Sequence, residues 1–266
     1  MAPYLKAAIG LVPVFSRPDH LPDTELERRG VAVDRGRLAG YNRVCGFRLT
    51  DALPPTYPHI LAFPLATKLM SAANFPFPVV GVVHVANRIE QRRPIDAGET
   101  LDLSVRAVDL REHERGRQFD VVATASAGGE EVWRGVSTYL RKERKGGSAR
   151  GGDRPEPPAP SARWRVQPRA GTDYARVSGD HNPIHTSRLG ARLFGFPRPI
   201  AHGMWSKARC LAALEGRLPE AYAVDVEFKL PILLPSTVAF SAQPQWTFAL
   251  HNAGSGKPHL AGTITA

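Results

Sequence analysis

Three short segments in the first half of this chain recur, in the same order, in the second half. The aligned pairs are Tyr41–Phe47 with Tyr174–Asp180, Leu61–Lys68 with Ile200–Lys207, and Pro94–Thr100 with Pro231–Thr237. Each similarity is weak by itself, but three of them in a fixed order indicate an internal duplication. The chain is therefore expected to fold as two copies of one structural unit.

A stretch rich in Gly, Pro and basic residues separates the two copies. Residues 143–163 contain two Gly-Gly pairs and the run Pro155–Pro160, a composition typical of a flexible, partly extended linker. We therefore predict a first domain over residues 1–142 and a second over residues 164–266. The basic piece Arg141–Arg150 suits a solvated linker, or it attracts an anionic partner by long-range electrostatics.

In each half, an apolar helical stretch precedes several strand-like runs. The helices are expected at about Ile60–Ala73 and Gly203–Leu214. The strands are expected at Val79–Ile89, Thr100–Leu110, Gln118–Ala127, Val132–Leu140, Ala223–Leu230, Thr237–Gln243, Gln245–Asn252 and His259–Thr265. A helix followed by an antiparallel meander is an α+β pattern, in which the helix packs on one face of the sheet.

The second half carries an acid, a base and a glycine turn, in the runs Ser178–His185 and His202–Met204. A glycine and a proline break any helix around Asp180 and His185, so both side chains can converge from one loop onto one water molecule. Gly203 begins an apolar stretch, which predicts a helix N-terminus whose free N–H groups can stabilise an oxyanion. These groups suit adding water to an activated acyl group, or removing it.

The first copy has lost these groups. Phe47 stands in place of Asp180, Ala52 near the position of His185, and Phe63-Pro64 in place of His202-Gly203. One active site per chain is therefore expected. The apolar replacements either form a wall of an acyl-binding cleft or simply fill the core.

The segment Tyr174–His185, continued by Gly195–Met204, resembles the MaoC-like dehydratases and the type 2, R-specific enoyl-CoA hydratases. The whole layout, with a degenerate first half, is similar to the mycobacterial-type two-domain 3-hydroxyacyl thioester dehydratases. The resemblance implies a double hot-dog fold, in which two antiparallel sheets each wrap a central helix. It also implies a hydro-lyase of fatty acid metabolism that interconverts (3R)-3-hydroxyacyl and trans-2-enoyl thioesters.

The resemblance assigns roles within the signature. Asp180 and His185 would hold and activate the catalytic water, Gly203 N–H would polarise the thioester carbonyl, and Asn182 would help to orient the site. Three further residues are assigned as substrate-binding or site-orienting: Ser178, His202 and Phe196. Ser178 is expected to cap the turn before the acid. His202 is expected to orient the turn at Gly203, called the donor turn below, by a hydrogen bond to backbone.

The other candidate groups have simpler interpretations. His181 is expected to face solvent, and His59 and His84 to line the core or the cleft. Tyr174 is expected to pack where the Asp-His loop begins. His181 and His185 are four residues apart, but no CxxC or facial-triad spacing accompanies the loop. We therefore expect no metal, and no cofactor beyond the coenzyme A or phosphopantetheine of the substrate.

Two alternative functions stay open at this point. A hot-dog acyl thioesterase would cleave the same substrates, and a non-catalytic acyl-thioester binding subunit would need a partner to act. The sequence does not choose between coenzyme A and acyl carrier protein as the thioester carrier, nor does it set the acyl chain length, the pathway or the oligomeric state, although a homodimer is possible.

Composition narrows the class of protein further. The 266 residues carry a formal net charge of +10, but the basic residues are scattered and no stacking-aromatic motif accompanies them, which argues against nucleic-acid binding. No apolar run approaches the ~20 residues of a membrane-spanning helix. The two cysteines, Cys45 and Cys210, are too few for a disulfide framework and favour a cytoplasmic location.

Overall fold

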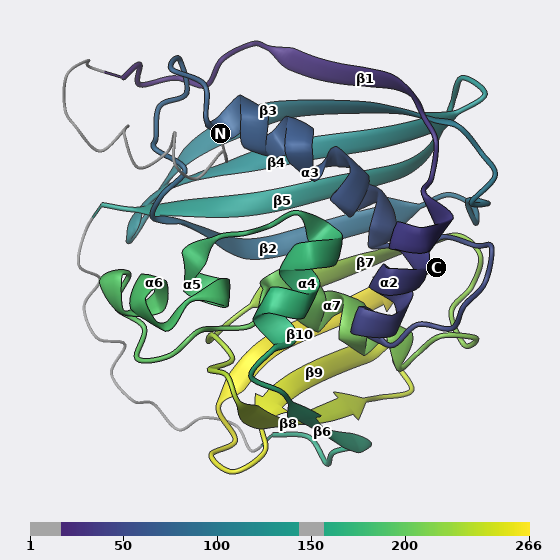
Figure 1. Ribbon diagram of the computed structural model, residues 1–266, viewed down its shortest axis with the longest axis vertical. Helices are drawn as coiled ribbons and strands as arrows, with labels where there is room; N and C mark the ends of the chain where they lie inside the picture. Colours follow the sequence, from purple (N-terminus) through teal and green to yellow (C-terminus); the bar gives the residue numbers. More distant parts are fainter. Residues whose placement is uncertain (1–16, 144–156) are drawn as a thin grey trace.

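Ten strands form one antiparallel sheet in the computed structural model, which describes residues 17–143 and 157–266. The first half contributes β1 (Glu25–Val31), α2 (Arg35–Cys45), α3 (Tyr57–Met70), β2 (Val82–Gln91), β3 (Leu101–His113), β4 (Gly116–Ala127) and β5 (Glu130–Lys142). The second half contributes β6 (Ala162–Val166), α4 (Ala170–Ser178), α5 (Pro183–Thr186), α6 (Arg188–Leu193), α7 (Gly203–Ala212), β7 (Tyr222–Phe228), β8 (Ser236–Ala242), β9 (Thr247–Asn252) and β10 (Pro258–Thr265). Figure 1 shows the helices gathered on one face of the sheet, which confirms the predicted α+β class.

The order of the strands makes the internal duplication visible. It runs β1-β3-β4-β5-β2-β7-β10-β9-β8-β6, so each strand of the first half has its counterpart at the same place beyond the central β2–β7 pair. On the helical face, the aligned residues Tyr41 of α2 and Tyr174 of α4 lie with their ring centroids 6.2 Å apart. The two expected sheets are thus joined into one continuous sheet by the backbone pairing of β2 with β7.

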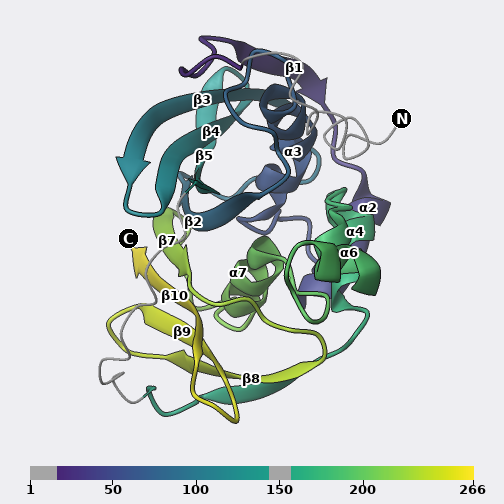
Figure 2. The ribbon, with the colours of Figure 1, turned by 90° about the vertical axis from the view of Figure 1, so that its left-hand side faces the viewer.

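The sheet curves around the two helices that the sequence predicts, α3 and α7 (Figure 2). α3 begins three residues before the predicted start at Ile60, because Pro58 at the helix start has its φ angle set for a first turn. It buries Ile60, Leu61, Leu69 and Met70 among the core side chains. α7 begins at Gly203, as predicted, and places a helix N-terminus inside the curved sheet.

All eight predicted strands are present, and their ends differ from the prediction by a few residues. The elements that the prediction missed are β1, β6, α2, α4, α5 and α6. β1 has the sequence ELERRGV, whose charged residues hide the alternation expected of a half-buried strand. The missed helices are short or weakly apolar, so periodicity does not reveal them.

Most of the predicted linker 143–163 falls outside the described residues. Its described end is not all linker, because Ala162 and Arg163 already belong to β6, which pairs with β8. The division into domains over 1–142 and 164–266 stays a prediction. Among the described residues no helix is long and apolar enough to cross a membrane, and both Cys45 and Cys210 are buried, free thiols.

A buried lysine ties α7 to the seam between the two half-sheets. Lys207 Nζ donates to the carbonyl oxygen of Asn87 at 2.9 Å, to Oδ1 of Asn87 at 2.7 Å and to the carbonyl oxygen of Val224 at 3.1 Å. Burial lowers the pKa of Lys207 well below its usual value. The three oxygens nevertheless match the three hydrogens of the ammonium form, so the amine bridges β2 and β7 as a charged group.

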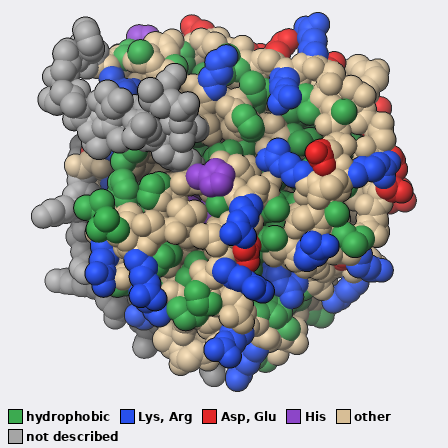
Figure 3. Space-filling view, viewed as in Figure 1, with side chains coloured by type: hydrophobic (Ala, Val, Ile, Leu, Met, Phe, Trp, Pro, Cys, Tyr) green, Lys and Arg blue, Asp and Glu red, His purple; other side chains and the backbone are tan. Residues whose placement is uncertain are grey.

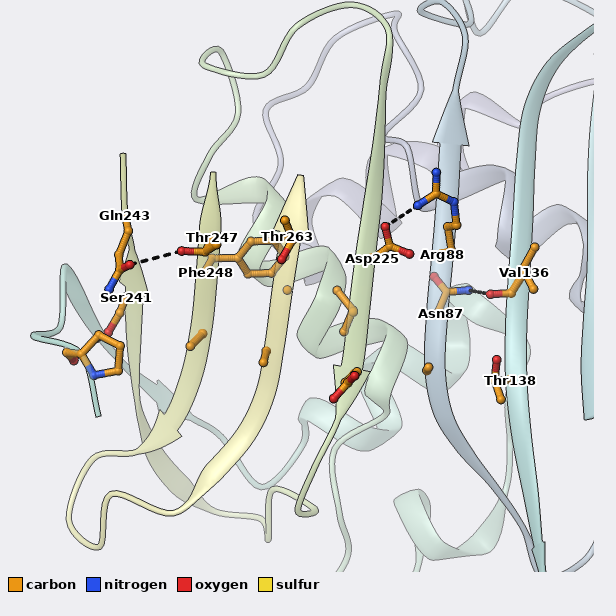
Figure 4. A pocket seen from close by; sticks show the side chains of 17 residues that line it. Asn87, Arg88, Val136, Thr138, Asp225, Ser241, Gln243, Thr247, Phe248 and Thr263 are labelled. Carbon is orange, nitrogen blue, oxygen red and sulfur yellow. Dashed lines mark hydrogen bonds and ion pairs between the residues drawn. The ribbon is translucent and has the colours of Figure 1, made fainter. Parts of the chain in front are cut away.

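The outer face of the sheet carries a shallow groove of about 710 Å³ across the same seam. Figure 4 shows mostly polar side chains along it and an ion pair between Arg88 and Asp225. Arg88 follows Asn87 on β2 and therefore points to the opposite face from α7, since side chains alternate along a strand. Neither Asp180 nor His185 lines this groove.

Replacing the buried lysine is expected to destabilise the protein. Lys207→Met removes the Nζ donor from three buried oxygens, so we expect the free energy of unfolding to fall by about 1–3 kcal/mol. The matched control is Lys68→Met, because Lys68 is the aligned residue of the first copy and is exposed. Denaturant unfolding of both variants measures the difference, and an equal effect of the two substitutions would contradict the bridging role.

Candidate active site

The loop that carries the predicted acid and base lies between two helices whose ends the sequence fixes locally. α4 ends at Ser178 and is capped by Gly179, which has the left-handed φ of 83° that a glycine adopts without strain. α5 begins at Pro183, which suits the first turn of a helix. Asp180 and His181 therefore lie on a short turn, and His181 is exposed, as predicted.

Three side chains of this loop bond to backbone N–H groups two residues further on. Ser178 Oγ accepts from Asp180 N–H at 3.1 Å, as expected for a turn cap, and Asp180 Oδ1 accepts from Asn182 N–H at 3.1 Å. Asn182 Oδ1 in turn accepts from Ile184 N–H at 3.2 Å and caps α5. These local bonds fix the direction in which the Asp180 carboxylate points.

His185 is almost buried, with 9% of its surface exposed. Its Nδ1 lies 2.8 Å from the carbonyl oxygen of Ile200, whose own N–H donates to Ile184 O at 3.1 Å. A carbonyl oxygen only accepts hydrogen bonds, so Nδ1 carries the hydrogen and Nε2 keeps its lone pair. A neutral imidazole held in this tautomer is prepared to take a proton at Nε2.

His202 lies against His185, a contact that the sequence spacing did not indicate. The two ring centroids are 3.6 Å apart with an interplanar angle of 26°, and only 3% of His202 is exposed. His202 Nε2 donates to the carbonyl oxygen of Asp180 at 3.0 Å and lies 3.7 Å from Asp180 Oδ2. This backbone bond reaches across to the acid loop, so His202 ties the start of α7 to that loop.

The ring of Tyr174 also lies against that of His202, with the centroids 4.8 Å apart. Tyr174 also contacts its aligned residue Tyr41, so it packs beside the start of the loop, as predicted. Phe196 lies in the segment after α6, half-buried, with its N–H donating to Ala191 O at 2.9 Å. Among the described residues no ring contact joins Phe196 to either histidine.

Gly203 is the first residue of α7, and His202 precedes it without capping the helix through its side chain. The N–H groups of this first turn are thus available to an oxygen of a ligand. A Cβ at Gly203 would lie 3.1, 3.2 and 3.3 Å from three ring atoms of Phe228, so the close approach favours glycine. The aligned residue of the first copy, Pro64, lies inside α3 and has no N–H to offer.

Burial keeps both site histidines neutral. It lowers the pKa of His185, and the nearby Asp180 charge opposes this only in part. Burial also lowers the pKa of His202, to about 3, with His185 lowering it further. Near neutral pH, the loop therefore presents a carboxyl group beside two uncharged imidazoles.

A second group of rings continues from Phe228 into the first half. His84 lies 5.0 Å from Phe228 and 4.7 Å from Tyr139, centroid to centroid, and His59 stacks 6.3 Å away. Burial lowers the pKa of His59 to about 4 and that of His84 to about 3, while the charge of Asp180 acts in the opposite direction on both. The two histidines are thus near enough to Asp180 for its charge to act on them, and the sequence singled out neither Tyr139 nor Phe228.

The Asp180, His185 and His202 side chains each place one potential ligand atom within 4.8 Å of the others. A metal ion can use such a spacing. However, the two imidazole rings are nearly parallel, so their in-plane lone pairs run side by side and do not converge on one point. The expectation of a metal-free site stays a prediction.

Comparison with known proteins finds relatives of this chain. Residues 154–246 match a family model described as a MaoC like domain. The chain is 39% identical to 3-hydroxyacyl-thioester dehydratase X of Mycobacterium tuberculosis, over 98% of this chain and 95% of that protein. The crystal structure of HtdX from M. tuberculosis is similar with a TM-score of 0.82 and 37% identity, covering 91% of this chain and 99% of that one.

A more distant structure supports the fold alone. A conserved hypothetical protein of M. tuberculosis, 13% identical, matches with a TM-score of 0.57 over 94% of this chain and 98% of its own, and its structure is a double hot-dog fold. These similarities confirm the predicted hot-dog architecture.

The buried neutral histidines predict that acid destabilises the protein. In the unfolded chain these histidines take up protons below about pH 6.5. In the folded protein they stay neutral until the pH nears their lowered pKa values, so the free energy of unfolding falls as the pH drops. His84→Phe removes one such group and is expected to reduce this loss by up to about 1.4 kcal/mol per pH unit. Thermal unfolding between about pH 7 and pH 4 measures this loss of stability, and His181→Gln, at an exposed histidine, is the control. If stability falls with pH equally in His84→Phe and in the unaltered protein, the interpretation is contradicted.

Proposed function

The chain belongs to the family of MaoC-like 3-hydroxyacyl-thioester dehydratases, and we propose that it interconverts (3R)-3-hydroxyacyl thioesters and trans-2-enoyl thioesters plus water. The activity makes it a hydro-lyase acting on fatty acyl thioesters. The observation that carries the proposal is the neutral His185, with its Nδ1 committed to the Ile200 carbonyl, beside Asp180 on one rigid loop.

In the hydration direction, His185 Nε2 and Asp180 hold one water molecule and remove a proton from it. The water oxygen bonds to C3 of the enoyl chain, and the C2–C3 π electrons move toward the thioester carbonyl. The N–H of Gly203 stabilises the enolate-like oxygen that results. The proton taken from water then returns to C2, so atoms and charge balance with no other reactant.

The dehydration direction reverses these steps. The pair removes the C2 proton, the oxyanion forms at the N-terminus of α7, and the C3 hydroxyl leaves as water after receiving a proton. The nucleophile in this scheme is water activated by a neighbouring base.

The assignment of the remaining residues follows their contacts. His202 orients both parts of the site, because it bonds to the backbone of Asp180 and immediately precedes Gly203. Ser178 and Asn182 hold the acid loop in place. We propose that the ring group of the first half, with His84 and Tyr139, forms a wall for the acyl chain.

Removing the acid or the base is expected to reduce turnover. Asp180→Asn and His185→Gln should each lower kcat about 10²- to 10⁴-fold, the usual range for general acid and base groups. The loss of ultraviolet absorbance of a trans-2-enoyl-CoA measures the rate, with free thiol monitored in parallel. His181→Gln, in the same loop but exposed, is the control and should keep the full rate.

Three results would contradict the proposal. Full activity in Asp180→Asn would remove the acid from the mechanism. Release of thiol by the unaltered protein would indicate a thioesterase. Substrate binding without turnover would indicate a binding subunit.

A methyl group at the donor turn is expected to disturb catalysis through Phe228. Gly203→Ala brings Cβ against the Phe228 ring, so the turn must shift, and we expect kcat to fall by up to about 10²-fold, the cost of losing one oxyanion donor. The double variant Gly203→Ala with Phe228→Leu removes the obstructing ring and should recover part of the rate. Equal activity of the two variants would show that the ring contact does not position the donor.

A further inference from the structure

The short helix α6 exposes an unusual concentration of apolar side chains. Leu189 and Leu193 are 69% and 77% exposed, and the next residue, Phe194, is 41% exposed. Positions four apart lie on the same side of a helix, so the two leucines form one surface. We call Leu189, Leu193 and Phe194 the α6 face; such a contiguous exposed patch is typical of a surface that contacts another molecule.

Arginines surround the α6 face. Arg188 and Arg192 lie on the same helix, again four residues apart, and Arg198 follows in the next segment; all three are exposed. Within residues 17–143 and 157–266, none of the three forms an ion pair. Figure 3 shows hydrophobic and basic side chains side by side at the left of the molecule, over the place where α6 lies in Figure 1.

The α6 face is rigidly connected to the catalytic loop. α6 follows directly on α5, which carries His185, and Ser187 Oγ accepts from Gly190 N–H at 3.2 Å to cap α6. A Cβ at Gly190 would lie 2.5 Å from Cβ of Pro183, so glycine allows the two helices to pack closely. A molecule bound on α6 therefore lies next to the loop that performs the proposed chemistry.

The chemistry of the patch favours one kind of partner. A second copy of this chain, bound α6 face to α6 face, would oppose arginines to arginines in a protein whose net charge is already +10. A nucleotide phosphate would use the arginines but leave the two leucines in water. An acidic protein with an apolar helix surface satisfies both features, because Arg is typical of interface contacts and the charges steer the encounter.

We propose that the α6 face docks an acidic carrier protein that holds the acyl thioester, and delivers its acyl chain to the adjacent Asp-His loop. This inference rests on the proposed function and names the partner that presents its substrate. The arginines attract and orient the carrier, and the leucines with Phe194 supply the apolar contact.

The test compares two substrates that share one acyl chain. One is a trans-2-enoyl chain on a holo acyl carrier protein, and the other is the same chain on N-acetylcysteamine, which has neither protein nor phosphate. The variants are Arg188→Glu with Arg192→Glu, and Leu189→Ser with Leu193→Ser. We expect each pair to lower kcat/KM for the carrier substrate at least about tenfold and to leave the small thioester unchanged.

A matched control keeps the net-charge change constant. Arg163→Glu with Arg165→Glu alters two exposed arginines on the edge strand β6, outside α6, and should leave both substrates unchanged. A similar loss of kcat/KM for the carrier substrate in this control would show that the effect comes from net charge alone, and would overturn the docking site.

The remaining outcomes separate the two proposals. If the unaltered protein hydrates neither substrate, the proposed function fails. If it hydrates the small thioester and the α6 variants use the carrier substrate as well as the unaltered protein does, the docking site alone fails. Loss of dimer in the leucine variant, or its loss of binding to anionic phospholipid vesicles, without any change in carrier kinetics would assign the face to self-association or to a membrane surface and would also overturn the proposal.

Discussion

The antiparallel pairing of β2 with β7 is the contact on which the rest of the structure depends. It joins the two halves into one sheet, from Ala86 opposite Glu227 to Gln91 opposite Tyr222. Lys207 anchors α7 on this seam from the inner side, and the Arg88–Asp225 ion pair crosses it on the outer side. Gly203 begins α7 and lies close to the ring of Phe228 at the end of β7, and Phe228 in turn contacts His84 of the first half. The same seam thus places the donor turn beside the rings of the first half.

The two copies have diverged by a local change in helix length as well as by substitution. In the second copy, the helix starts at Gly203 and exposes its N-terminus to the site. In the first copy, α3 already begins at Tyr57 and runs through Pro64, the residue aligned with Gly203. The first copy thus has no helix N-terminus at the equivalent position, which explains in physical terms why one site per chain is expected from a duplicated fold.

The sequence could predict those features that depend on local signals. Gly179 and Pro183 mark the helix ends that frame the acid loop, and the apolar runs mark α3, α7 and the eight strands other than β1 and β6. It could not predict that His202 would stack on His185, since that contact depends on how α7 and α5 pack. Phe228 and Tyr139 carry no local signal at all, because each is one aromatic residue in an ordinary strand. The helix α6 is too short for periodicity to reveal, so its exposed leucines became visible only in the structure.

Hydration at C3, with a solvent proton delivered to C2, is the central event proposed at the Asp-His loop. Incubating the protein with a trans-2-enoyl thioester in deuterium oxide and determining the configuration and isotope content of the product tests this most directly. The proposed mechanism yields an intact thioester of the (3R)-3-hydroxy acid carrying one solvent deuterium at C2. A (3S) product, or a free acid with an undeuterated C2 and an equivalent of free thiol, would contradict it.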